Sequence, residues 1–268
     1  MRIVLPSQGV LGCKEVELAL PRYSHLRALT EISYNEEEIG FAFVRSLLAD
    51  PGALAQMTFR DKDYLLAIAV ASLHMNVIKL KACCSCGEVV QVDFDLAQQE
   101  VIDLETPVAP VIKKSLNDEE YSYHFLSATD EQEIVRWAKQ HRDMAPSDRA
   151  AAVYQQSYEE GLITRTFGFD LTEDNVRRVS DFNILVFYSA LLFQEMSFHG
   201  VRPFVEHQCP KCGKPMIVVV PFAKSLMRWS SNDIINDFMS VSQFVGFESF
   251  LDLTFAELAQ MRANMDTM

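Results

Sequence analysis

Two short cysteine-rich segments contain the residues of this chain that could do chemistry. Cys83-Cys84-Ser85-Cys86-Gly87 and Cys209-Pro210-Lys211-Cys212-Gly213 each place two thiols at C-x-x-C spacing before a glycine. Four thiolates supplied in this way are typical of a tetrahedral structural zinc site. The predicted metal ligands are Cys83, Cys86, Cys209 and Cys212. We expect one structural Zn²⁺ per chain as the cofactor.

The sequence allows alternatives for the ligands and for the metal ion. Cys84 could compete with Cys83, and the neighbouring His207 could replace one cysteine. Iron suits four thiolates as zinc does. Without a metal, the cysteines would be reduced buried thiols or a redox dithiol of thioredoxin type. A thioredoxin-like motif follows a strand and opens a helix, whereas strand-like sequence continues after each glycine here.

The two cysteine pairs are far apart, because residues 87–208 lie between Cys86 and Cys209. An ordinary zinc ribbon separates its cysteine pairs by roughly 15 to 20 residues. Either one site is split around an inserted subdomain, or each pair holds its own metal. The flanks favour the split site, since apolar alternation predicts strands on both sides of each pair. The predicted strands are 78–81, 89–96, 203–206 and 216–220. Two such hairpins could share one ion.

Helical segments surround the predicted hairpins. Caps, early acidic residues and apolar residues at helical spacing identify them. The predicted helical segments are 35–50, a segment from Asp61 to Leu73, a segment starting at Thr129, 146–161 and 184–193. The expected fold class is α+β, with helical segments around two zinc-knuckle β-hairpins.

A helix that leads into a cysteine hairpin occurs twice, which predicts an internal pseudo-repeat. Asp61 and Asp181 open the two corresponding helices. The predicted parts are 1–105 with the first knuckle, 106–165 as a connector with a strand and helices, and 166–268 with the second knuckle and two terminal helices. The terminal region 231–268 is rich in phenylalanine and methionine, which serve both in cores and at interfaces. It is therefore also a candidate docking surface.

Composition limits the classes of function. The chain has 268 residues, 49% hydrophobic content and a formal net charge of −13, which indicates a globular protein and argues against one that coats nucleic acid. The most apolar stretch, 184–193, falls short of the roughly 20 residues that span a bilayer. The N-terminus does not resemble a signal peptide. Six cysteines, four of them in the knuckles, fit a reducing compartment.

No familiar catalytic motif is present in the sequence. It contains no P-loop, G-x-G-x-x-G, G-x-S-x-G or H-E-x-x-H pattern. Four thiolates also leave no open coordination position for a substrate. We therefore expect a protein that is not an enzyme. The alternative is a zinc-ribbon module that binds nucleic acid or takes part in transcription, which would require a basic surface beside the knuckles. Its candidate residues are Lys79, Lys81, Lys211 and Lys214.

The order of several segments resembles that of the T-even-type tailed-phage baseplate hub and hub assembly proteins. The similar segments are Leu5-Pro6-Ser7-Gln8-Gly9, 29–38, Asp61-Lys62-Asp63-Tyr64-Leu65-Leu66, 83–96 and 121–130. They cover roughly the first half of the chain, and the second half is similar only through its knuckle. The resemblance implies a structural or assembly protein of the viral baseplate, with other baseplate or tail proteins as partners. It implies the host cytoplasm during assembly, and the virion if the protein stays in the tail.

Overall fold

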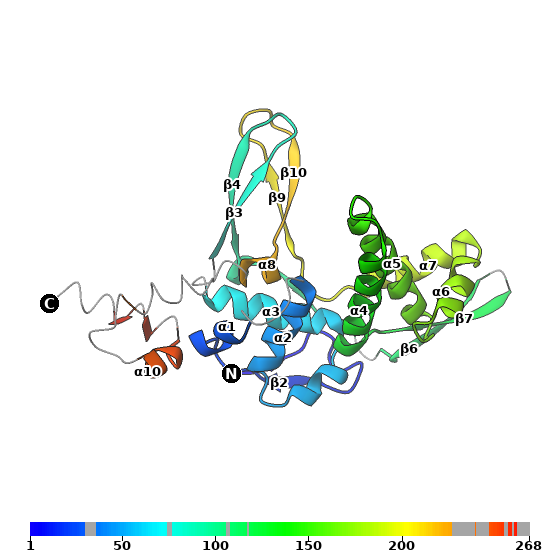
Figure 1. Cartoon of the computed structure of the whole chain (residues 1–268), viewed down its shortest axis with the longest axis horizontal. Helices are drawn as coiled ribbons and strands as arrows, with labels where there is room; N and C mark the ends of the chain where they lie inside the picture. The colour runs from blue at the N-terminus through cyan, green and yellow to red at the C-terminus, as the bar shows by residue number, and fades with distance from the viewer. Residues whose placement is uncertain are drawn as a thin grey trace.

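The computed structural model describes residues 1–29, 36–73, 77–105, 108–116, 118–226, 239, 247–254, 257–258 and 260–261. Over these residues, helices combine with small antiparallel two-stranded sheets, which agrees with the α+β prediction. Two hairpins project side by side from a helical body, and a second helical group lies beside that body (Figure 1). No described helix is both long enough and apolar enough to cross a membrane.

The N-terminal part forms the base of the body. Its elements are β1 (Arg2–Val4), β2 (Glu15–Glu17), α1 (Tyr23–Leu29), α2 (Glu36–Leu47), the 3-10 helix η1 (Pro51–Ala55) and α3 (Phe59–Leu73). Helix α3 begins slightly before the expected Asp61, because Thr58 and Asp61 cap it reciprocally. The Thr58 N–H donates to Asp61 Oδ2 at 3.0 Å, and the Asp61 N–H donates to Thr58 Oγ1 at 3.1 Å.

The projecting arm consists of the two predicted hairpins. Strand β3 (Val77–Cys83) pairs with β4 (Val89–Asp95), and β9 (Phe204–Gln208) pairs with β10 (Pro215–Val219), both antiparallel. Alternate apolar residues of both hairpins are buried in one hydrophobic cluster with the body. At the base of the arm, the rings of Phe94 and Phe222 meet edge to face with their centroids 5.5 Å apart.

The second helical group follows the first hairpin in the chain. After the first hairpin the chain forms η2 (Leu96–Gln98), β5 (Val101–Ile102), β6 (Val111–Leu116) and β7 (Glu119–His124). Four helices follow: α4 (Ala128–Met144), α5 (Ala150–Thr166), α6 (Glu173–Ser180) and α7 (Ile184–Met196). The remaining described elements are β8 (Gly200–Val201), α8 (Phe222–Leu226) and α10 (Phe247–Leu251). A capping box of Ser127 and Asp130 starts α4, close to the predicted Thr129. A second core of Tyr123, Phe167 and Phe193 packs this group together.

The C-terminal segment returns to the N-terminal body. The ring of Phe250 in α10 lies 4.4 Å from that of Tyr23, centroid to centroid, and both side chains are fully buried. Most of the predicted terminal helices in 231–268 lie outside the described residues. Among the described residues of this region, a capping box is present: the Thr254 N–H donates to Glu257 Oε2 at 2.7 Å, and the Glu257 N–H donates to Thr254 Oγ1 at 3.3 Å.

Candidate metal centre

Four thiols converge at the tip of the arm, two from each hairpin loop. They are Cys84, Cys86, Cys209 and Cys212, and their sulfur atoms all lie within 4.8 Å of one another. The Cys84–Cys212 and Cys86–Cys209 Sγ distances are both 3.7 Å. A tetrahedral ion with Zn–S bonds of about 2.3 Å places its sulfur atoms about 3.8 Å apart. The cluster is therefore compatible with one structural metal ion shared by the two hairpins.

The second loop shows how the backbone presents these thiols. The Cys209 N–H donates to the Lys214 carbonyl at 3.0 Å, and the Gly213 N–H donates to the Cys209 carbonyl at 2.9 Å. Gly213 has φ of +70°, in the left-handed region that favours glycine. The resulting tight turn directs Cys209 and Cys212 toward the same point.

The first loop repeats this pattern starting from Cys84. The Cys84 N–H donates to the Glu88 carbonyl at 2.8 Å, and the Gly87 N–H donates to the Cys84 carbonyl at 2.8 Å. Gly87 has φ of +85°. Cys84 thus occupies the position that Cys209 holds in the other hairpin, and the first loop is one residue shorter.

The structure accordingly gathers Cys84 rather than the predicted Cys83. Successive side chains of a strand point to opposite faces. Cys83 ends β3 opposite Val89 and is exposed, like Lys81 on the same face. Cys84 continues the buried face that contains Leu80, and it is only 6% exposed. The alternation of apolar and polar side chains along β3 was the sequence signal that indicated Cys84. The C-x-x-C spacing indicated Cys83 instead.

The other candidates lie apart from the cluster. His207 belongs to β9 and pairs with Met216 across the hairpin, outside the group of four thiols. Cys13 lies in the N-terminal body, where its Sγ is 3.4 Å from the Glu15 carbonyl oxygen. The predicted Cys86, Cys209 and Cys212 are all in the cluster.

The surroundings favour a thiolate at Cys84 only: although the Glu88 backbone opposes it, burial and the neighbouring thiols raise the pKa of Cys86 to about 12, and the pKa of Cys212 is raised as well. The backbone amide of Cys86, followed by the neighbouring thiols, lowers the pKa of Cys84 to about 6 although burial opposes this. Metals bind the thiolate form, so easy deprotonation assists binding. On the surface, Lys211 Nζ lies 3.5 Å from Glu88 Oε2 and links the two loops. Lys79 faces Asp93 across the first hairpin. Two of the four lysines that a nucleic-acid surface would need thus have acidic neighbours.

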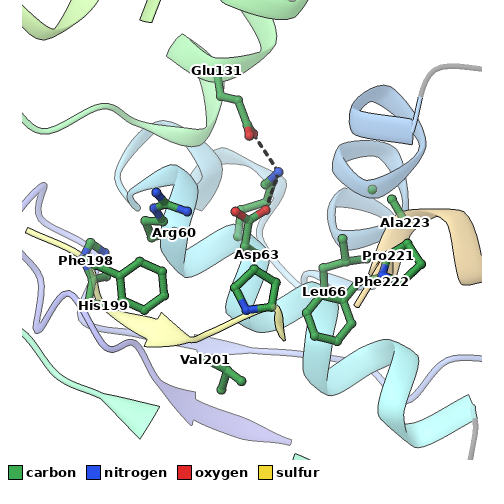
Figure 2. Close-up of a pocket in the computed structure, with 13 residues that line it drawn as sticks. Arg60, Asp63, Leu66, Glu131, Phe198, His199, Val201, Pro221, Phe222 and Ala223 are labelled. Atoms are coloured by element: carbon green, nitrogen blue, oxygen red, sulfur yellow. Dashed lines mark ion pairs between the residues drawn. The ribbon is translucent and has the colours of Figure 1, made fainter. Parts of the chain in front are cut away.

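A pocket of about 230 Å³ lies at the base of the arm, between α3, α4 and the segments that flank the second hairpin (Figure 2). In its wall, the buried Lys62 Nζ contacts Asp63 Oδ1 at 2.8 Å and Glu131 Oε2 at 2.7 Å. Burial alone would lower the pKa of Lys62, but the two carboxylates outweigh it and raise this pKa above its usual range. Lys62 is held as an ammonium ion, which is not a nucleophile. The triad is an internal tie between α3 and α4.

His199, at the edge of the same pocket, is also fully engaged. Its Nε2 lies 2.6 Å from Thr58 Oγ1, and its Nδ1 lies 2.8 Å from the Ser197 carbonyl oxygen. Burial lowers the pKa of His199, although the charge of Asp61 opposes this. Asp61 itself accepts a hydrogen bond from the Ser7 N–H at 3.0 Å. These contacts fix the start of α3, so the network has a structural role.

Comparison with known proteins gives no assignment: no protein-family model, curated protein or solved structure matches the chain. The interpretation of the site therefore depends on its own geometry.

Proposed function

We propose that the chain is a non-enzymatic structural or assembly protein whose arm is stapled by one structural zinc ion. The observation that carries this proposal is the convergence of four thiols from hairpins that are distant in the sequence. Four sulfur ligands would leave the metal no position for water or substrate. The ion would instead join the two hairpin tips, and its binding free energy would contribute to folding.

The biological setting that we propose is the baseplate of a contractile phage tail, as a hub or hub assembly component. Its support is the resemblance in the order of segments over the first half of the chain. Other baseplate or tail proteins would be the partners, in the host cytoplasm during assembly and then in the virion if the protein is retained. Cross-linking in a tail-assembly mixture should yield conjugates with baseplate proteins, and conjugates with nucleic acid alone would contradict this setting.

The metal proposal is tested by elemental analysis combined with native mass spectrometry. The wild-type chain should carry one zinc ion, and Cys209→Ser should lose both metal and thermal stability. Cys13→Ser is the matched control, because this cysteine lies outside the cluster, and it should keep the ion. One iron ion per chain would support the shared four-cysteine site but with iron in place of zinc. A metal-free wild-type chain, or full metal retention in Cys209→Ser, would refute the shared site.

A further inference from the structure

The four thiols of the cluster include two close pairs, and each pair joins one hairpin loop to the other. Cys84 Sγ lies 3.7 Å from Cys212 Sγ, and Cys86 Sγ lies 3.7 Å from Cys209 Sγ. The members of these pairs are 128 and 123 residues apart in the sequence. Because a disulfide bond is about 2.05 Å long, each pair of sulfur atoms has to approach by only about 1.7 Å to form one.

Contacts other than those of sulfur hold the two loops next to each other. Lys211 Nζ lies 3.5 Å from Glu88 Oε2 and connects the loops. Each loop is closed by its own backbone hydrogen bond, from the Cys84 N–H to the Glu88 carbonyl and from the Cys209 N–H to the Lys214 carbonyl. The hairpins also share one hydrophobic cluster at their base. The thiols therefore stay within reach of one another when a metal ion leaves.

Each of the two pairs combines an accessible thiol with a protected one. Cys86 and Cys212 are exposed, whereas Cys84 and Cys209 are buried. The susceptibility of a cysteine to oxidation follows its exposure as well as its thiolate character. An oxidant in solution thus meets the exposed thiol first, with a second sulfur atom directly behind it.

We propose that the cluster is also an oxidation site, at which hydrogen peroxide converts the four thiols into two disulfides, Cys84–Cys212 and Cys86–Cys209. This inference rests on the structural zinc staple proposed above and adds the response of that site to redox conditions. In reducing surroundings the ion joins the hairpin tips, and in oxidising surroundings the disulfides join the same tips.

The reaction needs one peroxide molecule for each disulfide. The exposed thiolate attacks a peroxide oxygen, the O–O bond breaks, hydroxide leaves, and the sulfur becomes a sulfenic acid. The buried thiolate then attacks that sulfur, the S–O bond breaks, and a second hydroxide leaves. Sulfur loses two electrons and the peroxide becomes two water molecules after protonation. Starting from four zinc-bound thiolates, two peroxide molecules and four protons give two disulfides, four water molecules and free Zn²⁺.

Bonds within each loop are the competing outcome. Cys209 and Cys212 have the C-x-x-C spacing of redox dithiols. Cys84 and Cys86 are separated only by Ser85, and a disulfide across one residue departs from the preferred geometry and is easily exchanged. Bonds within the loops would release the metal and leave the two tips unjoined. Bonds between the loops keep them joined, so the two outcomes differ in mechanical consequence as well as in connectivity.

Peptide mapping of the full chain after peroxide treatment identifies the bonds. The wild type should lose four hydrogen atoms and its metal. Trypsin cleaves after Lys211 and separates Cys209 from Cys212, so both of their peptides should be found joined to peptide 82–113. Peptides of Cys209 and Cys212 joined to each other would overturn the proposal. So would a chain whose thiols all remain open to alkylation after treatment.

Single variants determine which thiol pairs with which. After oxidation, Cys209→Ser should contain only the Cys84–Cys212 bond and leave Cys86 open to alkylation. A bond from Cys86 to Cys212 in this variant, or from Cys84 to Cys86, would overturn the assigned pairs. Cys13→Ser and Cys83→Ser are the controls and should form both bonds, because neither residue belongs to the cluster. Loss of a bond in Cys83→Ser would assign that bond to Cys83 and contradict the proposal.

Amide hydrogen exchange tests whether the disulfides replace the ion as a staple. The oxidised, metal-free chain should exchange its loop amides more slowly than the reduced, metal-free chain, and equal rates would contradict the replacement. The zinc proposal can fail separately. A wild type that is purified without metal but forms both bonds would refute the zinc staple alone. A zinc-loaded chain that forms bonds within its loops would refute the oxidation proposal alone.

Discussion

The adjacent Cys83 and Cys84, at and just beyond the end of β3, are expected to differ sharply in their effect on metal binding. Cys84→Ser removes a member of the thiol cluster, whereas Cys83→Ser changes an exposed side chain on the opposite face of the strand. Loss of a ligand should weaken metal binding by more than the roughly 10- to 100-fold cost of losing an outer-shell partner. Competition with a chromogenic chelator measures this. Equal losses in the two variants, or a loss confined to Cys83→Ser, would contradict the assignment.

Residue type and spacing predicted three of the four clustered thiols, and the difference at the fourth has a local cause. The C-x-x-C-Gly template assumes loops of equal length, but the first loop closes between Cys84 and Glu88 and is one residue shorter than the second. That closure brings the thiol of Cys84 into the cluster, on the opposite side of the chain from Cys83. The alternation of buried and exposed side chains from Leu80 onward indicates that Cys84, and not Cys83, faces the buried side, whereas the spacing of the cysteines does not.

The contact between helices α3 and α4 depends on a buried ion pair. The side chains of Lys62 and Glu131 are 3% and 9% exposed, and Nζ and Oε2 are 2.7 Å apart. Lys62→Met should lower the free energy of unfolding by about 3 to 5 kcal/mol, because the buried Glu131 would lose the ammonium group that it contacts. Lys113→Met is the control: its pair with Glu120 is 65% and 64% exposed, so it should cost less than about 1 kcal/mol. Urea denaturation provides both values.

The double variant Lys62→Met with Glu131→Leu distinguishes a charge effect from a packing effect. Apolar residues in place of both charges should recover much of the lost stability, since a buried pair is often replaceable by apolar side chains. A double variant whose loss equals the sum of the two single losses would show that the ions are not coupled.

Elements with a strong local signal were predictable, and elements that depend on a partner were not. Helices α3 and α4 begin at capping residues, and α2 lies within the predicted segment 35–50, whose apolar residues recur at helical spacing. Strand β6 is half-exposed or exposed along its length and lacks clear alternation, so only its pairing with β7 makes it a strand. Helix α6 was missed despite its cap, in which the Asn175 N–H donates to Thr172 Oγ1 at 3.2 Å, because it is short and highly charged.

In the whole molecule, the arm is held in two different ways along its length. Its base shares the main hydrophobic cluster with the body, and at its tip the four thiols lie close together, where a shared metal would join the two hairpins. The hairpins leave the body at separate points of the chain and rise together (Figure 1). The sequence predicted each hairpin, but the common base depends on contacts between distant residues such as Phe94 and Phe222.

Removal of the metal should therefore loosen the tip of the arm without unfolding the body. With a chelator present, amide hydrogen exchange should accelerate at least about tenfold in 82–90 and 208–216, equivalent to about 1.4 kcal/mol of local opening free energy. Helix α5, far from the cluster, is the internal control and should exchange at an unchanged rate. Faster exchange throughout α3 and α5 would mean that the ion supports the whole fold. Unchanged exchange at the tip would mean that the thiols do not staple the arm, because the apolar base would then be sufficient to hold both hairpins together.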